Sequence, residues 1–143
     1  MRLAMPRLAH RRSDRDREAR EMEAKWFIRN IAEVPWREFP DHFGGALSKP
    51  LVWPQNSEAR HLDYRISMYQ PMAYVKVHRH KTQEQIYHVL KGEGLMEIDG
   101  QSRVVREHDV IFLPPGIDHA ISNSGLVDLV FLVITSPVED GAV

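Results

Sequence analysis

Hydrophobic and polar residues alternate in short segments along most of this chain. The apolar segments are rich in Val, Ile and Tyr and are bounded by Gly, Pro, Asn and Asp, which is the pattern of β-strands. Asp99-Gly100 stands between two of them and signals a tight hairpin. Many short strands at regular spacing predict an all-β barrel. The expected strands are 46–53, 63–70, 72–78, 85–90, 94–98, 101–105, 110–113, 119–123 and 127–134, the last apolar enough to have both faces covered.

Two histidines stand at the end of one predicted strand. Residues 74–78 alternate and are partly β-branched, and His78 is followed two positions later by His80. Side chains two apart on a strand point to the same face, so both imidazoles can reach one metal ion. A single His-x-His pair is also common on an ordinary polar strand face. The pair therefore predicts a site only together with further ligands.

A third candidate ligand stands where the chain enters the next strand. That strand begins at Gln85, which shares one face with Tyr87 and Val89. Glu84 points to the opposite face, so Gln85 and Glu84 cannot both reach the ion. Glu84 would complete the more usual set of three histidines and one carboxylate, whereas Gln85 adds a neutral amide oxygen. We choose Gln85 and keep Glu84 as the alternative.

His119 completes the candidate set. It follows the turn Pro114-Pro115-Gly116, in which the fixed φ of proline and the permissive glycine set where the next strand begins. Three imidazoles and one amide oxygen suit a divalent transition metal, with Fe, Mn, Ni, Zn and Cu all possible. The expected metal ligands are His78, His80, Gln85 and His119.

These motifs resemble those of the cupin family. The resemblance covers residues 62–135 and implies a cupin barrel, which is a double-stranded β-helix or jelly roll, with an N-terminal helical or irregular arm. The first family motif is His-x-His, four residues, Glu, six residues, Gly, and it matches His78, His80, Gln85 and Gly92. The second is Gly, five residues, Pro-x-Gly-x-x-His-x-x-x-Asn, and it matches Pro114, Gly116, His119 and Asn123.

The chain departs from the family pattern at two positions. Gln85 replaces the motif glutamate, which removes a negative charge beside the ion. This change is expected to weaken divalent binding somewhat and to raise the Lewis acidity felt by a bound water. Some small cupins that act on unsaturated uronic sugars resemble this chain in using His, His, Gln and His, a likeness in ligands that carries no substrate with it. His108 replaces the leading glycine of the second motif and is expected to be a surface turn substitution.

Composition limits the remaining possibilities. A chain of 143 residues is expected to form one domain that buries a core without disulfides. It has no cysteine, so any metal must be held by nitrogen and oxygen ligands. Residues 26–143 carry 11 basic and 15 acidic side chains. A mildly acidic barrel has no basic face for nucleic acid, and no apolar window is long enough to cross a membrane, so we expect a cytoplasmic protein.

We divide the chain into four parts: a charged extension (1–25), an aromatic-rich arm packing on the barrel (26–60), the barrel core (61–137) and a tail (138–143). The extension carries seven Arg and one Lys against five acids and lacks the apolar run of a secretory signal. It is expected to be a solvated helix over 13–26 or, alternatively, to precede a true start at Met22; the remaining alternative is an arm that binds a partner. The arm holds all three tryptophans, and packing of such an arm predicts a homodimer.

The arm also offers a rival interpretation, in which Trp36 or Phe43 closes the mouth of the pocket as a lid. The pocket itself is expected to be mostly apolar, with the phenol of Tyr87 and the amide of Asn123 as its polar groups. Tyr87 is the candidate catalytic residue, as a hydrogen-bond donor or as a general acid if the ion lowers its pKa. The alternative is a barrel tyrosine satisfied by a neighbour.

The predicted function is that of a metal-binding cupin acting on a small organic molecule. The ion would be an O2-activating centre in a dioxygenase, or a Lewis acid in an isomerase or lyase. The alternative is a non-catalytic sensor or small-molecule-binding barrel. The substrate does not follow from the sequence.

Overall fold

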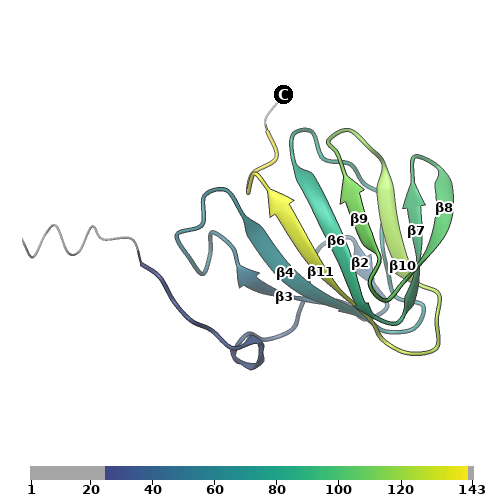
Figure 1. Cartoon of the computed structure of the whole chain (residues 1–143), viewed down its shortest axis with the longest axis horizontal. Coiled ribbons are helices and arrows are strands. Elements are labelled where there is room, and N and C mark those ends of the chain that lie inside the picture. The colour runs from purple at the N-terminus through teal and green to yellow at the C-terminus, as the bar shows by residue number, and fades with distance from the viewer. Residues whose placement is uncertain (1–24, 142–143) are drawn as a thin grey trace, which may run out of the picture.

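The computed structural model describes residues 25–141 and consists of two antiparallel β-sheets that pack face to face (Figure 1). One sheet has the strand order β1-β3-β4-β11-β6-β9 and the other β2-β5-β10-β7-β8. The elements are a 3-10 turn η1 (Ile31–Glu33) and the strands β1 (Arg37–Glu38), β2 (His42–Phe43), β3 (Ala46–Val52), β4 (Asp63–Tyr69), β5 (Tyr74–Val75), β6 (Glu84–Lys91), β7 (Glu93–Ile98), β8 (Gln101–Arg106), β9 (Val110–Leu113), β10 (His119–Asn123) and β11 (Leu129–Ser136).

The all-β prediction is confirmed, and the expected strands appear with small shifts at their ends. The segment 72–78 differs most, because only Tyr74–Val75 is regular strand. It continues as an isolated bridge between His78 and His119. Asp99-Gly100 forms the predicted hairpin turn between β7 and β8, and both residues have positive φ.

The core lies between the two sheets. Its largest fully buried side chains include Tyr69, Phe131 and Met96, and the Tyr69 and Phe131 rings meet edge to face with centroids 5.1 Å apart. β11 contributes Phe131 at the centre, but only alternate residues of this strand are buried. The expectation that both its faces are covered is therefore wrong for this chain, because β11 has one face toward the core and one toward the outside.

The outer face of the six-stranded sheet is nevertheless apolar. A sheet with one face on the core usually has a polar face toward water. Here two cross-strand rows run over β4, β11, β6 and β9 and contain one polar side chain, His88, besides the tyrosine hydroxyl. Val110 and Phe112 are 62% and 58% exposed. The rows are Tyr64–Ile134–Ile86–Phe112 and Ile66–Leu132–His88–Val110.

Backbone conformation at two turns explains the glycine at position 92 and the glycine that the family pattern has at position 108. Gly92 has φ +84, and a Cβ there would lie 2.6 Å from the Asp128 carbonyl oxygen, so only glycine fits. His108 also has positive φ, +75, on an exposed turn. The left-handed backbone accounts for the glycine that the family pattern has at this position, and an exposed histidine accepts it here at some conformational cost.

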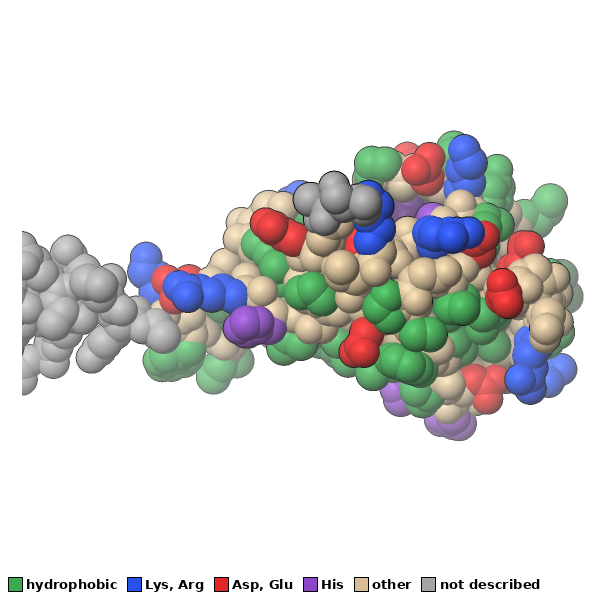
Figure 2. All heavy atoms as spheres, turned by 90° about the horizontal axis from the view of Figure 1, so that it is seen from above, with side chains coloured by type: hydrophobic (Ala, Val, Ile, Leu, Met, Phe, Trp, Pro, Cys, Tyr) green, Lys and Arg blue, Asp and Glu red, His purple; other side chains and the backbone are tan. Residues whose placement is uncertain are grey.

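The arm preceding the barrel contributes to both sheets. β1 and β2 are edge strands, and β3, which falls within 26–60, pairs with β4 inside the six-stranded sheet. Trp26 and Ile28 are 83% and 91% exposed and belong to the segment that runs away from the two sheets (Figure 1). The space-filling view narrows at this end of the molecule (Figure 2). The proposed 1–25 extension and the helix over 13–26 lie almost wholly outside the described residues. Within residues 25–141, helices of the length and apolarity that a membrane crossing requires do not occur.

Candidate metal centre

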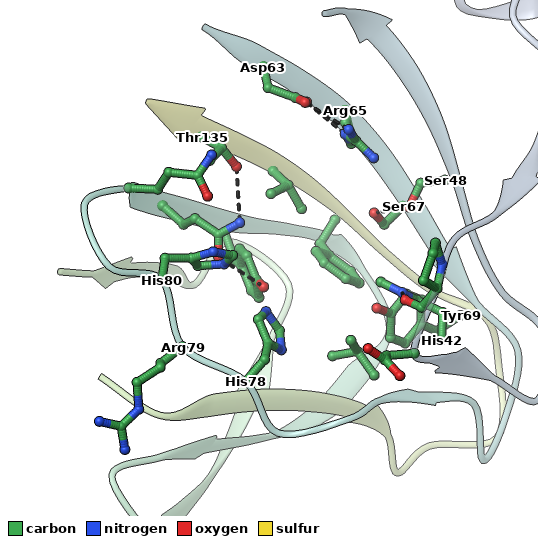
Figure 3. Close-up of a pocket in the computed structure, with 18 of the residues that line it drawn as sticks. His42, Ser48, Asp63, Arg65, Ser67, Tyr69, His78, Arg79, His80 and Thr135 are labelled. Atoms are coloured by element: carbon green, nitrogen blue, oxygen red, sulfur yellow. Dashed lines mark hydrogen bonds and ion pairs between the residues drawn. The ribbon is translucent and has the colours of Figure 1, made fainter. Parts of the chain in front are cut away.

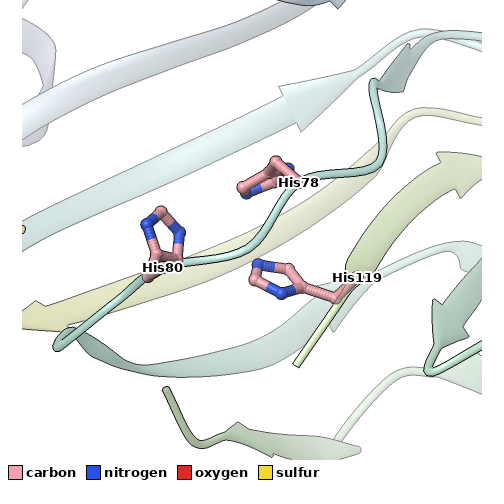
Figure 4. A group of neighbouring side chains, drawn as sticks. All are labelled: His78, His80 and His119. Atoms are coloured by element: carbon pink, nitrogen blue, oxygen red, sulfur yellow. The ribbon is translucent and has the colours of Figure 1, made fainter. Parts of the chain in front are cut away.

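Three imidazoles converge at one end of the barrel interior. His78, His80 and His119 each offer a nitrogen, and these atoms lie within 4.8 Å of one another (Figure 4). The ring centroids are 5.1 Å apart for His78 and His80 and 4.3 Å apart for His78 and His119. His119 follows His80 by 39 positions in the sequence, yet the fold places the three imidazoles around one point. This spacing is that of a set of ligands around a single ion.

Backbone hydrogen bonds hold the two motifs together. The His78 N–H donates to the His119 carbonyl at 3.0 Å, and the His119 N–H donates to the His78 carbonyl at 2.9 Å. The Gly116 N–H donates to the His80 carbonyl at 2.7 Å. The Pro-Pro-Gly turn is thus attached to the segment that carries the first two histidines. The relative position of the three imidazoles is therefore determined mostly by main-chain bonds.

The hydrogen bonds of two rings determine which nitrogen carries the proton. His78 Nδ1 lies 2.8 Å from the Lys76 carbonyl oxygen, and His119 Nδ1 lies 2.9 Å from the Ile117 carbonyl oxygen. A carbonyl oxygen only accepts, so each Nδ1 must donate. The Nε2 atoms of His78 and His119 are then unprotonated in the neutral rings. An imidazole oriented in this way is prepared to ligate a metal through Nε2.

Gln85 faces the imidazoles from β6. It is buried, its Oε1 lies 3.1 Å from His119 Nε2, and its Nε2 donates to Thr135 Oγ1 at 3.0 Å. Tyr87 Oη donates to the same Oε1 at 3.4 Å. With the Gln85 amide oriented this way, Oε1 and His119 Nε2 face each other as two acceptors, a contact that a cation between them stabilises. Rotation of the amide, with Nε2 toward His119 and Oε1 toward the Thr135 hydroxyl, also satisfies both atoms. Three converging imidazoles and an amide oxygen are a donor set that fits a divalent transition metal.

Burial favours the neutral form of two of the three imidazoles, His80 and His119. Desolvation lowers the pKa of His119 to about 4. Desolvation, followed by the neighbouring His78, also lowers the pKa of His80. His80 Nε2 is buried and has no hydrogen-bond partner among residues 25–141, a costly arrangement for a polar atom. A neutral imidazole with a lone pair that no donor uses is able to ligate a metal ion.

The two candidates for the fourth ligand lie on opposite faces of β6. Gln85 is buried beside His119, whereas Glu84 is exposed. The faces of Gln85, Tyr87 and Val89 are as the alternation predicts. Coordination by Gln85 itself stays a prediction.

Three of the four metal-ligand candidates, His78, His80 and Gln85, line a cavity of about 460 Å³ (Figure 3). The expectation of a mostly apolar pocket is wrong for its far wall, where β3 and β4 present Ser48, Asp63, Arg65 and Ser67. Asn123 was expected in the pocket, but its amide donates to the carbonyls of Tyr69 and Val127, so it stabilises the chain there. Trp36 and Phe43 are not among the described residues that line the cavity, whereas Pro40, Asp41 and His42 of the same arm do line it.

Tyr87 lies beside the candidate metal centre, but in the structure its surroundings raise the pKa of the phenol and do not lower it. The side chain is buried and lines the cavity, and burial raises the pKa of the phenol. Its hydroxyl is therefore a protonated donor at neutral pH, directed at Gln85 Oε1. A donor role is supported better than proton release, and the catalytic role stays a prediction.

The C-terminal tail adds a contact that the sequence did not reveal. Asp140 accepts hydrogen bonds from the backbone N–H groups of Lys81 and Thr82 at 2.8 and 2.7 Å, and its carboxylate lies 3.9 Å from His80 Nδ1. The loop that follows His80 is thus attached to the tail. An acidic residue near the end of a chain carries no signal of such a role, because the contact depends on the fold.

The fold and this site define a cupin, and the chain belongs to the cupin family. Residues 65–135, about half of the chain, match the family model described as "Cupin domain". The match includes both histidine motifs and the strands that position them.

Individual relatives agree with this assignment. The chain is 41% identical over 61 residues to an uncharacterized protein of Methanocaldococcus jannaschii, covering 43% of this chain and 49% of that protein. It is 36% identical over 64 residues to an oxalate-binding protein of Thermotoga maritima, covering 45% and 53%. The chain thus spans about half the length of these relatives. The crystal structure of a predicted oxalate decarboxylase from Thermotoga maritima is similar in fold, with a TM-score of 0.70 at 23% identity over 78% of this chain and 99% of that one.

Proposed function

We propose that this cupin binds a divalent transition metal through the Nε2 atoms of His78 and His119, a nitrogen of His80 and Oε1 of Gln85, and that the ion binds and activates a small organic molecule in the adjoining cavity. The convergence of nitrogens from His78, His80 and His119 within 4.8 Å of one another carries this proposal. Gln85 Oε1, 3.1 Å from His119 Nε2, and the buried His80 Nε2, which lacks a hydrogen-bond partner among residues 25–141, support it. Fe, Mn, Ni, Zn and Cu all suit these ligands.

Four neutral ligands leave the charge of a divalent ion uncompensated by protein anions. Such an ion would supply Lewis acidity toward a ligand oxygen or a binding position for O2. The protein's part is to orient its ligands: Thr135 holds the Gln85 amide by a 3.0 Å hydrogen bond, and Lys76 and Ile117 hold the rings of His78 and His119. Tyr87 contributes a buried hydroxyl that donates to Gln85 or to a bound oxygen.

Two reaction types suit this arrangement: oxidation by O2, as in a dioxygenase, and proton transfer next to a polarised carbonyl or enol, as in an isomerase or lyase. The alternative function is non-catalytic binding of a small molecule, as in a sensor. The name of the Thermotoga relative refers to oxalate binding, so oxalate is the first ligand to test here. We further propose a cytoplasmic location.

The first experiment is elemental analysis of the full chain purified without an affinity tag, beside a His78→Ala/His80→Ala variant and a His88→Ala/His108→Ala control. His88 lies on the outer face of β6, and His108 lies on an exposed turn. We expect about one transition metal per chain in the wild type and the control, and loss of the metal in the first variant. Absence of metal after anaerobic reconstitution would contradict the proposal and favour the sensor function.

Turnover in air and under argon then separates the functions. Oxidation requires O2 consumption and stops without air, whereas an isomerase or lyase continues under argon. Saturable binding without turnover would support the sensor. Iron or copper in the purified protein favours oxidation by O2, whereas nickel, manganese or zinc favours an isomerase or lyase reaction.

We also propose a homodimer that buries the apolar outer face of the six-stranded sheet. The face carries exposed Val110 and Phe112, and the arm of the same chain carries exposed Trp26 and Ile28. A second copy of the chain carries the same apolar face and the same apolar arm. The arm and the face of one copy can therefore pack against the apolar surfaces of the other. Burial of such area is the main driving force for association.

A further inference from the structure

The cavity has a polar wall opposite the candidate metal centre. Asp63, Arg65 and Ser67 are successive inward-facing residues of β4, and Ser48 faces inward beside them on β3. Figure 3 shows these four side chains together, away from His78 and His80. We call Ser48, Asp63, Arg65 and Ser67 the polar wall. Inward positions of a barrel usually hold apolar side chains, so four polar residues there need a reason.

The register gives the distance between the two polar ends of the cavity. β11 lies between β4 and β6, with Val133 paired to Arg65 on one side and to Tyr87 on the other. Neighbouring strands are about 4.8 Å apart, so β4 and β6 are separated by about 10 Å. Phe131 and Val133 make the stretch between them apolar. The cavity is thus polar at both ends, with a hydrophobic floor wide enough for a six-carbon chain together with the oxygen groups at its two ends.

Arg65 is held rigidly and keeps one edge available. Its Nε and Nη2 donate to the two carboxylate oxygens of Asp63, both at 2.7 Å. The guanidinium carbon lies 4.4 Å from the Phe39 ring centroid and 4.9 Å from that of Trp53. Within residues 25–141, Nη1 makes no hydrogen bond. A rigid guanidinium with an open edge is well suited to binding ligand oxygens.

The two serines also leave a donor available. Ser48 Oγ and Ser67 Oγ are buried and lie 2.8 Å apart. One hydroxyl hydrogen lies between them, so the other points elsewhere, and no acceptor for it occurs in the described part of the chain. A hydroxyl pair of this kind can donate to and accept from a ligand hydroxyl.

The charge of the wall favours hydroxyls over a second anionic group. Asp63 pairs with Arg65 through both carboxylate oxygens, and Asp41, which also lines the cavity, adds a negative charge. Arg79 lines the cavity too but is paired with Asp118. A carboxylate at this wall would meet no net positive charge. A hydroxyl group, in contrast, can use both the donors of Arg65 and the acceptors of Asp63.

We propose that the polar wall binds the hydroxylated tail of an organic acid of about six carbons, whose carboxylate and neighbouring hydroxyl lie at the candidate metal centre. The assignment rests on the proposed metal site, which binds the acid end. Oxalate would fill only the metal end of a cavity of about 460 Å³. The remaining space and its polar wall are what a longer, hydroxylated ligand requires.

Three acids with the same head and length test this proposal: gluconate, 2-hydroxyhexanoate and 2-hydroxyadipate, whose tails carry hydroxyls, only hydrogens, and a carboxylate. Each is titrated calorimetrically into the metal-loaded full chain, with metal content measured beforehand. We expect gluconate to bind at least about tenfold more tightly than the other two, because two or more hydrogen bonds to the tail distinguish it.

Two variants of the wall are compared with a matched control. Ser48→Ala/Ser67→Ala removes the hydroxyls without changing charge, and Asp63→Asn/Arg65→Gln removes both charges together so that neither is left unpaired. Ser102→Ala/Arg103→Gln on exposed β8 is the control. We expect the preference for gluconate to fall to within about threefold in the wall variants and to remain in the control. Circular dichroism and metal content show whether each variant is folded.

The outcomes separate the two proposals. A metal-loaded wild type that prefers 2-hydroxyadipate, binds all three acids equally or binds none contradicts the wall assignment alone. Unchanged preference in both wall variants also contradicts it and makes the Asp63–Arg65 pair structural. A wild type that holds no metal contradicts the proposed function. It then also removes the basis for assigning an acid whose carboxylate the metal would bind.

Discussion

Arg79 and Asp118 form a bidentate ion pair that joins the two histidine motifs. Arg79 Nε and Nη2 donate to the two carboxylate oxygens of Asp118 at 2.7 and 2.8 Å. Arg79 stands between His78 and His80, and Asp118 immediately precedes His119. The pair is exposed, with side-chain exposures of 61% and 42%, so solvent screens it and it contributes little to stability. Its position connects the main-chain segments from which the imidazoles project.

The first prediction concerns this pair. Asp118→Asn leaves the backbone bonds between the motifs in place but removes the charge pairing, so we expect metal affinity to fall severalfold and the melting temperature of the apo protein to stay the same. Competition with a chromophoric chelator measures the affinity. Arg106→Gln breaks a comparable exposed pair with Glu93 at a distance from the site and serves as the control. Equal affinities in both variants would show that Asp118 has no positioning role.

The second prediction distinguishes the two candidates for the fourth ligand. Gln85→Ala removes the buried amide oxygen and should lower metal occupancy severalfold. Glu84→Ala changes an exposed side chain and should leave occupancy near that of the wild type. Elemental analysis of both variants at equal protein concentration decides the matter. Loss of metal only in Glu84→Ala would reverse the assignment.

The third prediction concerns Tyr87. Tyr87→Phe removes the 3.4 Å hydrogen bond to Gln85 Oε1 while keeping the buried ring, so we expect unchanged metal content and a stability loss under about 1 kcal/mol. If Tyr87 donates to the reacting oxygen, turnover falls by about 100-fold. Because burial raises the pKa of the phenol, the wild-type rate should show no loss from tyrosine ionisation in mildly alkaline solution. Full activity of Tyr87→Phe would leave Tyr87 as a core residue.

The fourth prediction concerns pH and the loop after His80. Hydrogen bonds from the Lys81 and Thr82 N–H groups lower the pKa of Asp140 from its ordinary 3.8 to about 2. A lowered pKa means that the folded protein favours the ionised carboxyl. The contribution of this contact to folding stability is therefore complete above about pH 4 and declines below it, and the attachment itself is lost as the carboxyl takes up a proton near pH 2. Carboxyl NMR titration should give a midpoint near 2, and a midpoint near 4 would show that the contact does not form.

The fifth prediction concerns assembly. Phe112→Glu places a charge on the outer face of the six-stranded sheet, and we expect it to convert a dimer into a monomer. Val104→Glu changes a similarly exposed residue of the other sheet and should leave the dimer intact. Light scattering after size-exclusion chromatography measures both masses. A wild-type monomer at micromolar concentration, or a Phe112→Glu dimer, would contradict the proposed interface.

Much of the fold was predictable because strand signals are local. Alternation identified nearly every strand, and the two motifs identified the family. β4 shows the limit of this reasoning: Tyr64, Ile66 and Met68 make its apolar face, which a sequence argument would turn inward, yet the structure turns Asp63, Arg65 and Ser67 inward. Alternation shows that two faces differ, but it does not show which one faces the cavity.

The sequence by itself determined the strands, the barrel and the four candidate ligands, because these follow from local alternation and from spacing within two short motifs. Only the tertiary structure decided that His119 Nε2 faces Gln85 Oε1, that Asp140 holds the loop after His80, and that a polar wall stands opposite the candidate metal centre. Each of these contacts joins residues from distant strands or loops. Their distances depend on the pairing and packing of the sheets, which no local pattern encodes.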